Sequence, residues 1–150
     1  MTSWSDVERD EPLFAARVRR IFEAHKHKTI ATLRADGSPR ISGIEAEFGA
    51  ELTFGSMPGA RKGADLHRDP RFALHSATVD PPDGDPAGWP GEAKIAGLAR
   101  YAGDLDGDPP GELFAADIRE VVITGLDPAA TVLVIESWRP GRGLRRVERA

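Results

Sequence analysis

The sequence predicts a mainly β fold with flanking helices, in which about seven antiparallel strands close into a small split barrel. Three observations lead to this prediction. One amphipathic helix pattern stands near the N-terminus, the rest of the chain consists of short runs rich in Val, Ile and Thr, and Gly, Pro and Asp separate these runs. Closure into a barrel removes the open edges of a flat sheet. Because no linker interrupts the 150 residues, one domain is expected over residues 1–150.

The helix is expected over residues 13–26. Phe14, Val18, Ile21 and Phe22 recur at the spacing of one helical face, and Pro12 suits the first helical turn. The acidic segment before it, residues 1–11, is expected to be a flexible N-terminus.

The strands follow from β-branched and alternating runs bounded by turn residues. They are expected over residues 29–33, 41–48, 52–56, 72–77, 93–101, 118–124 and 131–138. The second strand is expected to bend at Gly43. A short helix is expected over residues 60–67, a helical turn over residues 112–117, and loops over residues 80–91 and 104–111.

The composition excludes several kinds of protein. Without cysteine the chain has no disulfide or thiol nucleophile, and its four histidines have no acidic partners at metal-ligand spacing, so no metal site is expected. The net charge of −4 argues against nucleic-acid binding. No apolar run reaches the ~20 residues of a membrane helix, and the N-terminus lacks the apolar core of a secretory signal. A cytoplasmic protein that binds neither nucleic acid nor membrane is expected.

The segment over residues 54–62 has the pattern of a phosphate-binding turn. A strand ends at Gly55 and Ser56, a turn with Pro and Gly follows, and Arg61 and Lys62 open a short helix. Proteins bind phosphate through hydroxyl groups, backbone N–H groups at a helix start, and Lys or Arg side chains. The alternative is an ordinary surface turn in which Arg61 forms an ion pair with Asp65 along the helix.

These motifs, in this order, resemble the pyridoxamine 5'-phosphate oxidase-like family of FMN-binding split barrels. The resemblance extends over residues 13–146. It is carried by the Thr-Ile-Ala-Thr-Leu strand, the Asp-Gly-Ser-Pro-Arg turn, the S-x-x-x-x-R-K motif and the Asp-Pro-Arg that follows it. It implies that Ser56, Arg61 and Lys62 hold the cofactor phosphate, with Gly55 beside them.

The resemblance implies further contacts to the cofactor. Residues of the bent strand would flank the flavin ring and ribityl chain, namely Arg40, Ile41, Ser42 and Gly43. The segment Glu-Ser-Trp-Arg-Pro-Gly-Arg is similar to the Trp-led segment of the family, so Trp138 and Arg142 would approach the cofactor from the partner subunit.

The implied function is that of an FMN-dependent oxidoreductase, which transfers a hydride to or from a small organic substrate and acts as a homodimer. No catalytic side chain is implied, because the flavin carries the chemistry in such proteins. Two alternatives stay open. One branch of the family uses the deazaflavin coenzyme F-420, whose polyglutamate tail would suit the Arg-rich C-terminus. The other alternative is a non-enzymatic flavin- or haem-binding module.

Overall fold

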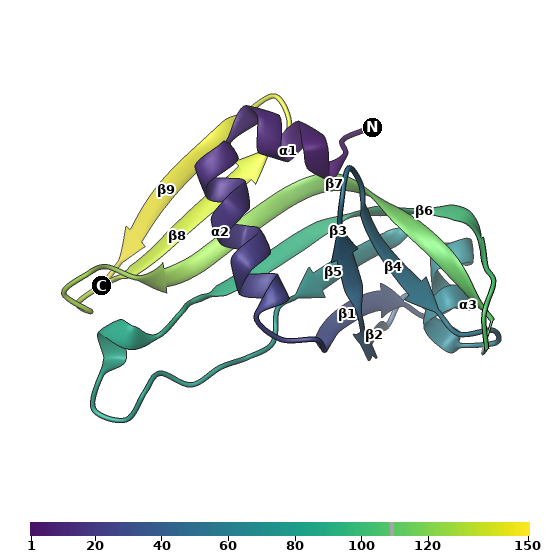
Figure 1. Cartoon of the computed structure of the whole chain (residues 1–150), viewed down its shortest axis with the longest axis horizontal. Coiled ribbons are helices and arrows are strands. Elements are labelled where there is room, and N and C mark those ends of the chain that lie inside the picture. The colour runs from purple at the N-terminus through teal and green to yellow at the C-terminus, as the bar shows by residue number, and fades with distance from the viewer. Residues whose placement is uncertain (109) are drawn as a thin grey trace.

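The computed structural model describes residues 1–108 and 110–150. In this part of the chain, nine antiparallel strands form one sheet, accompanied by three α-helices and a short 3-10 helix (Figure 1). The mainly β class with flanking helices is therefore confirmed. No helix of the described residues is long and apolar enough to cross a membrane.

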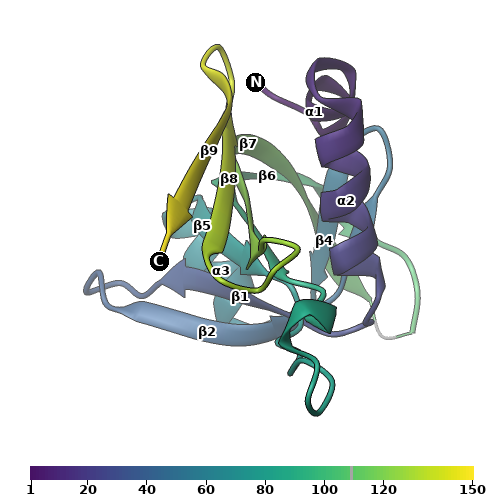
Figure 2. The same ribbon diagram turned by 90° about the vertical axis from the view of Figure 1, so that its left-hand side faces the viewer.

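Two helices, α1 (Trp4–Asp10) and α2 (Pro12–Glu23), lie together along one side of the sheet (Figure 2). The predicted flexible N-terminus is wrong, because α1 occupies most of residues 1–11. The Ser3 side chain accepts from the Asp6 N–H while the Asp6 carboxylate accepts from the Ser3 N–H, and this capping box starts the helix. Trp4 is fully buried and packs edge-on against the Phe48 ring, with 4.8 Å between the centroids.

The order of the strands explains how the barrel closes. β1 (Lys28–Leu33) pairs with β2 (Pro39–Ile44) and with β5 (Arg71–His75), whereas β3 (Ala46–Phe48) pairs with β4 (Leu52–Ser56). The sheet runs β2-β1-β5-β6-β7-β4-β3, so its two end strands are separated in the chain by Glu45 alone. A sheet whose end strands are consecutive has to curl until its edges meet. The single strand predicted over residues 41–48 is therefore two strands at opposite edges.

β7 (Gly111–Leu126) is the longest strand and pairs with three others, β4, β6 (Glu92–Leu105) and β8 (Leu133–Arg139). It pairs with β6 along most of its length and with β4 through residues 112–115. The helical turn predicted over residues 112–117 is wrong, because all six residues pair with β6 and residues 112–115 pair also with β4. The Ala-rich sequence there favours a helix locally, but pairing within the sheet outweighs that preference.

The chain ends in a hairpin of β8 (Leu133–Arg139) and β9 (Gly143–Arg149), which joins the sheet through β7. The basic C-terminal segment is thus a strand. In Figure 1 this hairpin lies at the opposite end of the molecule from α3 (Arg61–Arg68).

One face of the sheet stays exposed. The register places five apolar side chains on it in neighbouring strands, and we call them the outer face: Ala31, Ile41, Ala73, Ala96 and Val122. Ile41 is 75 % exposed there.

Candidate functional site

A cavity of about 620 Å³ lies where the ends of β2 and β4 meet the start of α3. Four of the residues predicted to bind the cofactor line it: Gly43, Gly55, Ser56 and Lys62. They come from three elements, and the closure of the barrel brings them together.

Ser56 is the last residue of β4 and is 5 % exposed. Its hydroxyl donates to the Met57 carbonyl at 3.3 Å and sits against the first turn of α3. A Cβ at position 63 would lie 2.8 Å from Ser56 Oγ, so only glycine at position 63 lets the helix approach this hydroxyl. The turn between them passes through Gly59 at φ +73°, a conformation that glycine adopts without strain.

Lys62 links α3 to β2 across the cavity. Its ammonium donates to the Gly43 carbonyl at 3.0 Å. An ammonium has three donors, so this contact fixes the side chain and leaves donors for an anion in the cavity.

Arg61 does not join Lys62. It is exposed and lines a separate depression on the other side of the helix, together with Arg34, Arg40 and Arg68. The predicted phosphate ligands are therefore divided between two surfaces. The alternative pairing of Arg61 with Asp65 is also absent from the ion pairs of the described residues, in which Asp65 binds Arg40 and Arg68.

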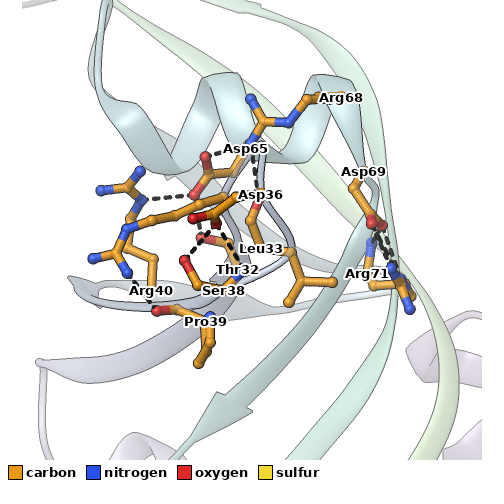
Figure 3. A network of polar contacts seen from close by, with 11 residues as sticks. Thr32, Leu33, Asp36, Ser38, Pro39, Arg40, Asp65, Arg68, Asp69 and Arg71 are labelled. Atoms are coloured by element: carbon orange, nitrogen blue, oxygen red, sulfur yellow. Dashed lines mark hydrogen bonds and ion pairs between the residues drawn. The ribbon is translucent and has the colours of Figure 1, made fainter.

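Asp65 is the centre of a buried network that Figure 3 shows. Its carboxylate accepts from Arg40 Nε at 2.7 Å, from Thr32 Oγ1 at 2.8 Å and from Arg68 Nη2 at 2.8 Å. Burial raises the pKa of Asp65, but the hydrogen bonds from Arg40, Thr32 and Arg68 outweigh it and lower the pKa from 3.8 to about 2. The network ties α3 to β1 and β2, and it holds the helix that carries Lys62.

The remaining β2 residues point in different directions. Arg40 is engaged by Asp65, and Ile41 belongs to the outer face. Ser42 is half-buried and does not line the 620 Å³ cavity, whereas Gly43 does. Of the four β2 residues predicted to flank the cofactor, the structure places only Gly43 in this cavity.

Trp138 and Arg142, the predicted C-terminal contacts, do not line the 620 Å³ cavity. Trp138 is 2 % exposed, packs in the core of its own chain and donates its indole N–H to Asp10 at 2.6 Å. The Arg142 guanidinium folds back onto the Ser137 carbonyl and hydroxyl. The structure packs the Trp138 side chain within its own chain, and its contact with a partner's cofactor stays a prediction.

Two lysines of the cavity, Lys26 and Lys28, were not among the predicted site residues, and Lys28 is the buried one. It is 6 % exposed and lines the cavity beside Lys26 and His27. The signal was the alternation within residues 28–33, which puts Lys28 on the same inward side as Ile30 and Thr32.

No family model and no curated protein matches the sequence of the chain. Several solved structures match its backbone. A pyridoxamine 5'-phosphate oxidase-related, FMN-binding protein from Nostoc punctiforme shares 9 % identity at a TM-score of 0.64, over 93 % of this chain and 96 % of that one. A heme-binding protein from Mycobacterium smegmatis shares 13 % identity at a TM-score of 0.56, over 88 % of this chain and 86 % of that one. An F-420 reductase shares 17 % identity at a TM-score of 0.51, over 67 % of this chain and 91 % of that one.

These identities are too low to transfer a function, but the likeness of the backbones extends over most of each chain. The chain has the split-barrel fold of the pyridoxamine 5'-phosphate oxidase-like proteins, as the resemblance in its sequence predicted.

Proposed function

We propose that this protein binds a flavin-type cofactor, FMN, and acts as an oxidoreductase on a small organic substrate. The observation that carries the proposal is the cavity between β2, β4 and α3, which presents a buried hydroxyl and a fixed ammonium, from Ser56 and Lys62, at the start of a helix. These are the groups that bind a phosphate monoester.

The remaining walls of the cavity are mixed. Gly43 leaves open space beside its backbone, Phe54 and Leu105 add apolar surface, and Glu45 and Glu47 add two carboxylates. The volume of 620 Å³ is in the range of small-molecule sites, roughly 300–1,000 Å³. When bound, the flavin would supply the hydride chemistry, and the residues of the chain would hold its phosphate and orient its ring.

The structural neighbours support a ligand of this kind, since one of them is described as FMN-binding. Another is an F-420 reductase, and the deazaflavin also carries a phosphate that Ser56 and Lys62 could bind. We favour FMN, because the arginines expected to bind the polyglutamate tail of the deazaflavin do not line the cavity. They belong to β9, which lies at the opposite end of the molecule from α3 (Figure 1). Haem is the third ligand to test, since one neighbour binds it and His27 lines the cavity.

Titration calorimetry with FMN, coenzyme F-420 and haemin tests the proposal. We expect FMN to bind most tightly and riboflavin, which lacks the phosphate, to bind poorly. If neither flavin binds below about millimolar concentration, a free energy near −4 kcal/mol, the cofactor proposal fails. Anaerobic reduction of the bound flavin, followed by reoxidation with organic acceptors, then tests hydride transfer. A flavin that binds but exchanges no electrons would indicate a non-enzymatic module.

We also propose that the protein is a homodimer that pairs through the outer face. Ile41 and the small Ala31, Ala73 and Ala96 form an apolar strip, beside the charged Lys94 and Glu120, that a second copy could cover. Because Ile41 and Gly43 are close neighbours on β2, such an interface would lie beside the cavity.

A further inference from the structure

Lys62 alone does not neutralise the charge of a bound phosphate. A phosphate monoester carries about −1.5 to −2 at pH 7, so one ammonium neutralises only part of it. The sequence assigns the second cation to Arg61, but Arg61 faces away from the cavity. If FMN binds in the cavity, as proposed above, another cation has to supply the remaining charge.

Lys28 is a buried cation without a counter-charge. Its ammonium donates to the Lys26 carbonyl at 3.1 Å. Across residues 1–108 and 110–150, no carboxylate lies within ion-pair distance of it. A buried charge is costly unless it is paired, and two of its three donors have no hydrogen bond to the described protein. Lys26, by contrast, is exposed and forms an ion pair with Glu45 at 3.6 Å.

The register of β1 and β2 brings Lys28 close to Lys62. Lys28 pairs with Ile44 on β2, and the Lys62 ammonium binds the carbonyl of Gly43, the residue before it. Both lysines line the same cavity, and Ser56 lines it as well. The two cations and the hydroxyl thus reach one cavity from β1, α3 and β4.

We propose that Lys28 is the second cation of the phosphate site, in the place that the sequence motif gives to Arg61. The inference rests on the proposed function. The cavity also carries Lys26, which pairs with Glu45, and Glu47. Lys28 and Lys62 are the two lining lysines without an ion pair in the described part of the chain, and together they would match the charge of a phosphate dianion. The class of ligand that this site selects is a flavin with a terminal phosphate.

The test compares Lys28→Met with Arg61→Ala in the full-length protein. Methionine keeps the length of the buried stem and removes only the charge. Affinities for FMN and for riboflavin are measured by calorimetry. Hydrogen bonds to charged groups predict a loss of about ten- to hundred-fold in FMN affinity for Lys28→Met, with riboflavin affinity unchanged. Arg61→Ala should change FMN affinity no more than about two-fold, because its guanidinium is exposed outside the cavity.

The opposite pattern overturns the inference: FMN affinity retained in Lys28→Met and lost in Arg61→Ala. An equal loss of FMN and riboflavin in Lys28→Met also overturns it, because the lysine would then act on the fold and not on the phosphate. If Lys28→Met does not fold, a crystal structure of the wild-type protein with FMN decides, by placing the phosphate next to Lys28 Nζ or next to Arg61. Failure of FMN to bind the wild-type protein would contradict the proposed function itself.

Discussion

At the scale of single residues, the site depends on contacts that hold charged groups in place before any ligand arrives. The Gly43 carbonyl positions the Lys62 ammonium. Helix α3 packs against the Ser56 hydroxyl, which it can do because position 63 has no side chain. Groups that are already fixed lose little conformational freedom on binding, which favours affinity. The specificity for phosphate should therefore respond sharply to the loss of one charge.

Lys62→Ala is expected to weaken FMN binding by about ten- to hundred-fold, because it removes a charge-assisted contact worth roughly 1.5–3 kcal/mol. The matched control is Arg20→Ala, which removes an exposed cation from α2, outside the cavity. Fluorescence titration should show FMN affinity within about two-fold of wild type in the control. Equal losses in both variants would mean that the effect is general electrostatics and that the cavity does not hold the phosphate.

Asp65 gives a prediction about pH. Its pKa is about 2 in the folded protein and 3.8 unperturbed, so the carboxylate stabilises the fold above about pH 4 and this stabilisation is lost as the pH falls towards 2. The difference between the two pKa values corresponds to about 2 kcal/mol. Asp65→Asn should lower the free energy of unfolding by roughly 3 kcal/mol at pH 7, because it leaves Arg40 without its buried partner.

Urea denaturation between pH 7 and pH 2 measures this effect, and the gap between wild type and Asp65→Asn should narrow at low pH. Asp69→Asn is the control. The hydrogen bonds from Arg71 also bring the pKa of Asp69 to about 2, but that pair is on the surface, where solvent screens it. The control should stay close to wild type, and an equally large loss there would show that burial is not the cause.

At the scale of elements, α1 is a helix in an acidic segment that was predicted to be flexible. Trp4 and Val7 are its buried residues, and the Trp4 Nε1 is buried without a hydrogen-bond partner among the described residues. Trp4→Ala should lower the free energy of unfolding by roughly 3–5 kcal/mol. Trp4→Phe should cost less than about 2 kcal/mol, because it keeps an aromatic ring and removes the unsatisfied donor.

Chemical denaturation compares these variants with Leu13→Ala, whose side chain is 83 % exposed and which should change stability by no more than about 0.5 kcal/mol. If Trp4→Ala were as stable as Leu13→Ala, α1 would not be part of the folded core.

Most elements could be predicted from local pattern, and the failures have physical reasons. The strand at residues 29–33, the strand at 52–56 and the helix at 60–67 were predicted nearly to the residue, because each combines a clear period with turn residues at its ends. The first half of β7 was missed because only its partners on both sides make it a strand. The capping box from Ser3 to Asp6 was a signal for α1 that could have been used.

The site was predictable only in part, for a related reason. A motif gives the order of residues, whereas the side of a helix on which each residue falls depends on packing. Arg61 and Lys62 are adjacent in the sequence and yet face different surfaces. Lys28 lies outside the motif, and only the pairing of β1 with β2 brings it to the cavity.

At the scale of the whole molecule, the outer face predicts the state of assembly. Ile41→Glu should convert the proposed dimer into a monomer near 16.2 kDa, because it places a charge at a 75 % exposed apolar position of the proposed contact. Leu13→Glu is the matched control, since Leu13 is equally exposed but lies on α2. Analytical ultracentrifugation should find a dimer for the wild type and for Leu13→Glu. A monomeric wild type with FMN bound would refute the dimer.

The position of β7 in the sheet has a consequence for how the chain reaches its fold. β4 and β6 are separated by more than thirty residues of sequence, and both depend on β7, which comes later in the chain than either. Until residues 111–126 leave the ribosome, β4 and β6 each present an unpaired edge, and the barrel cannot close. Folding is therefore late and dominated by distant pairings, which makes it slow. A nascent chain stalled before Gly111 should be sensitive to protease and prone to aggregate, whereas one stalled after Leu126 has left the exit tunnel already has every partner that β4 and β6 require.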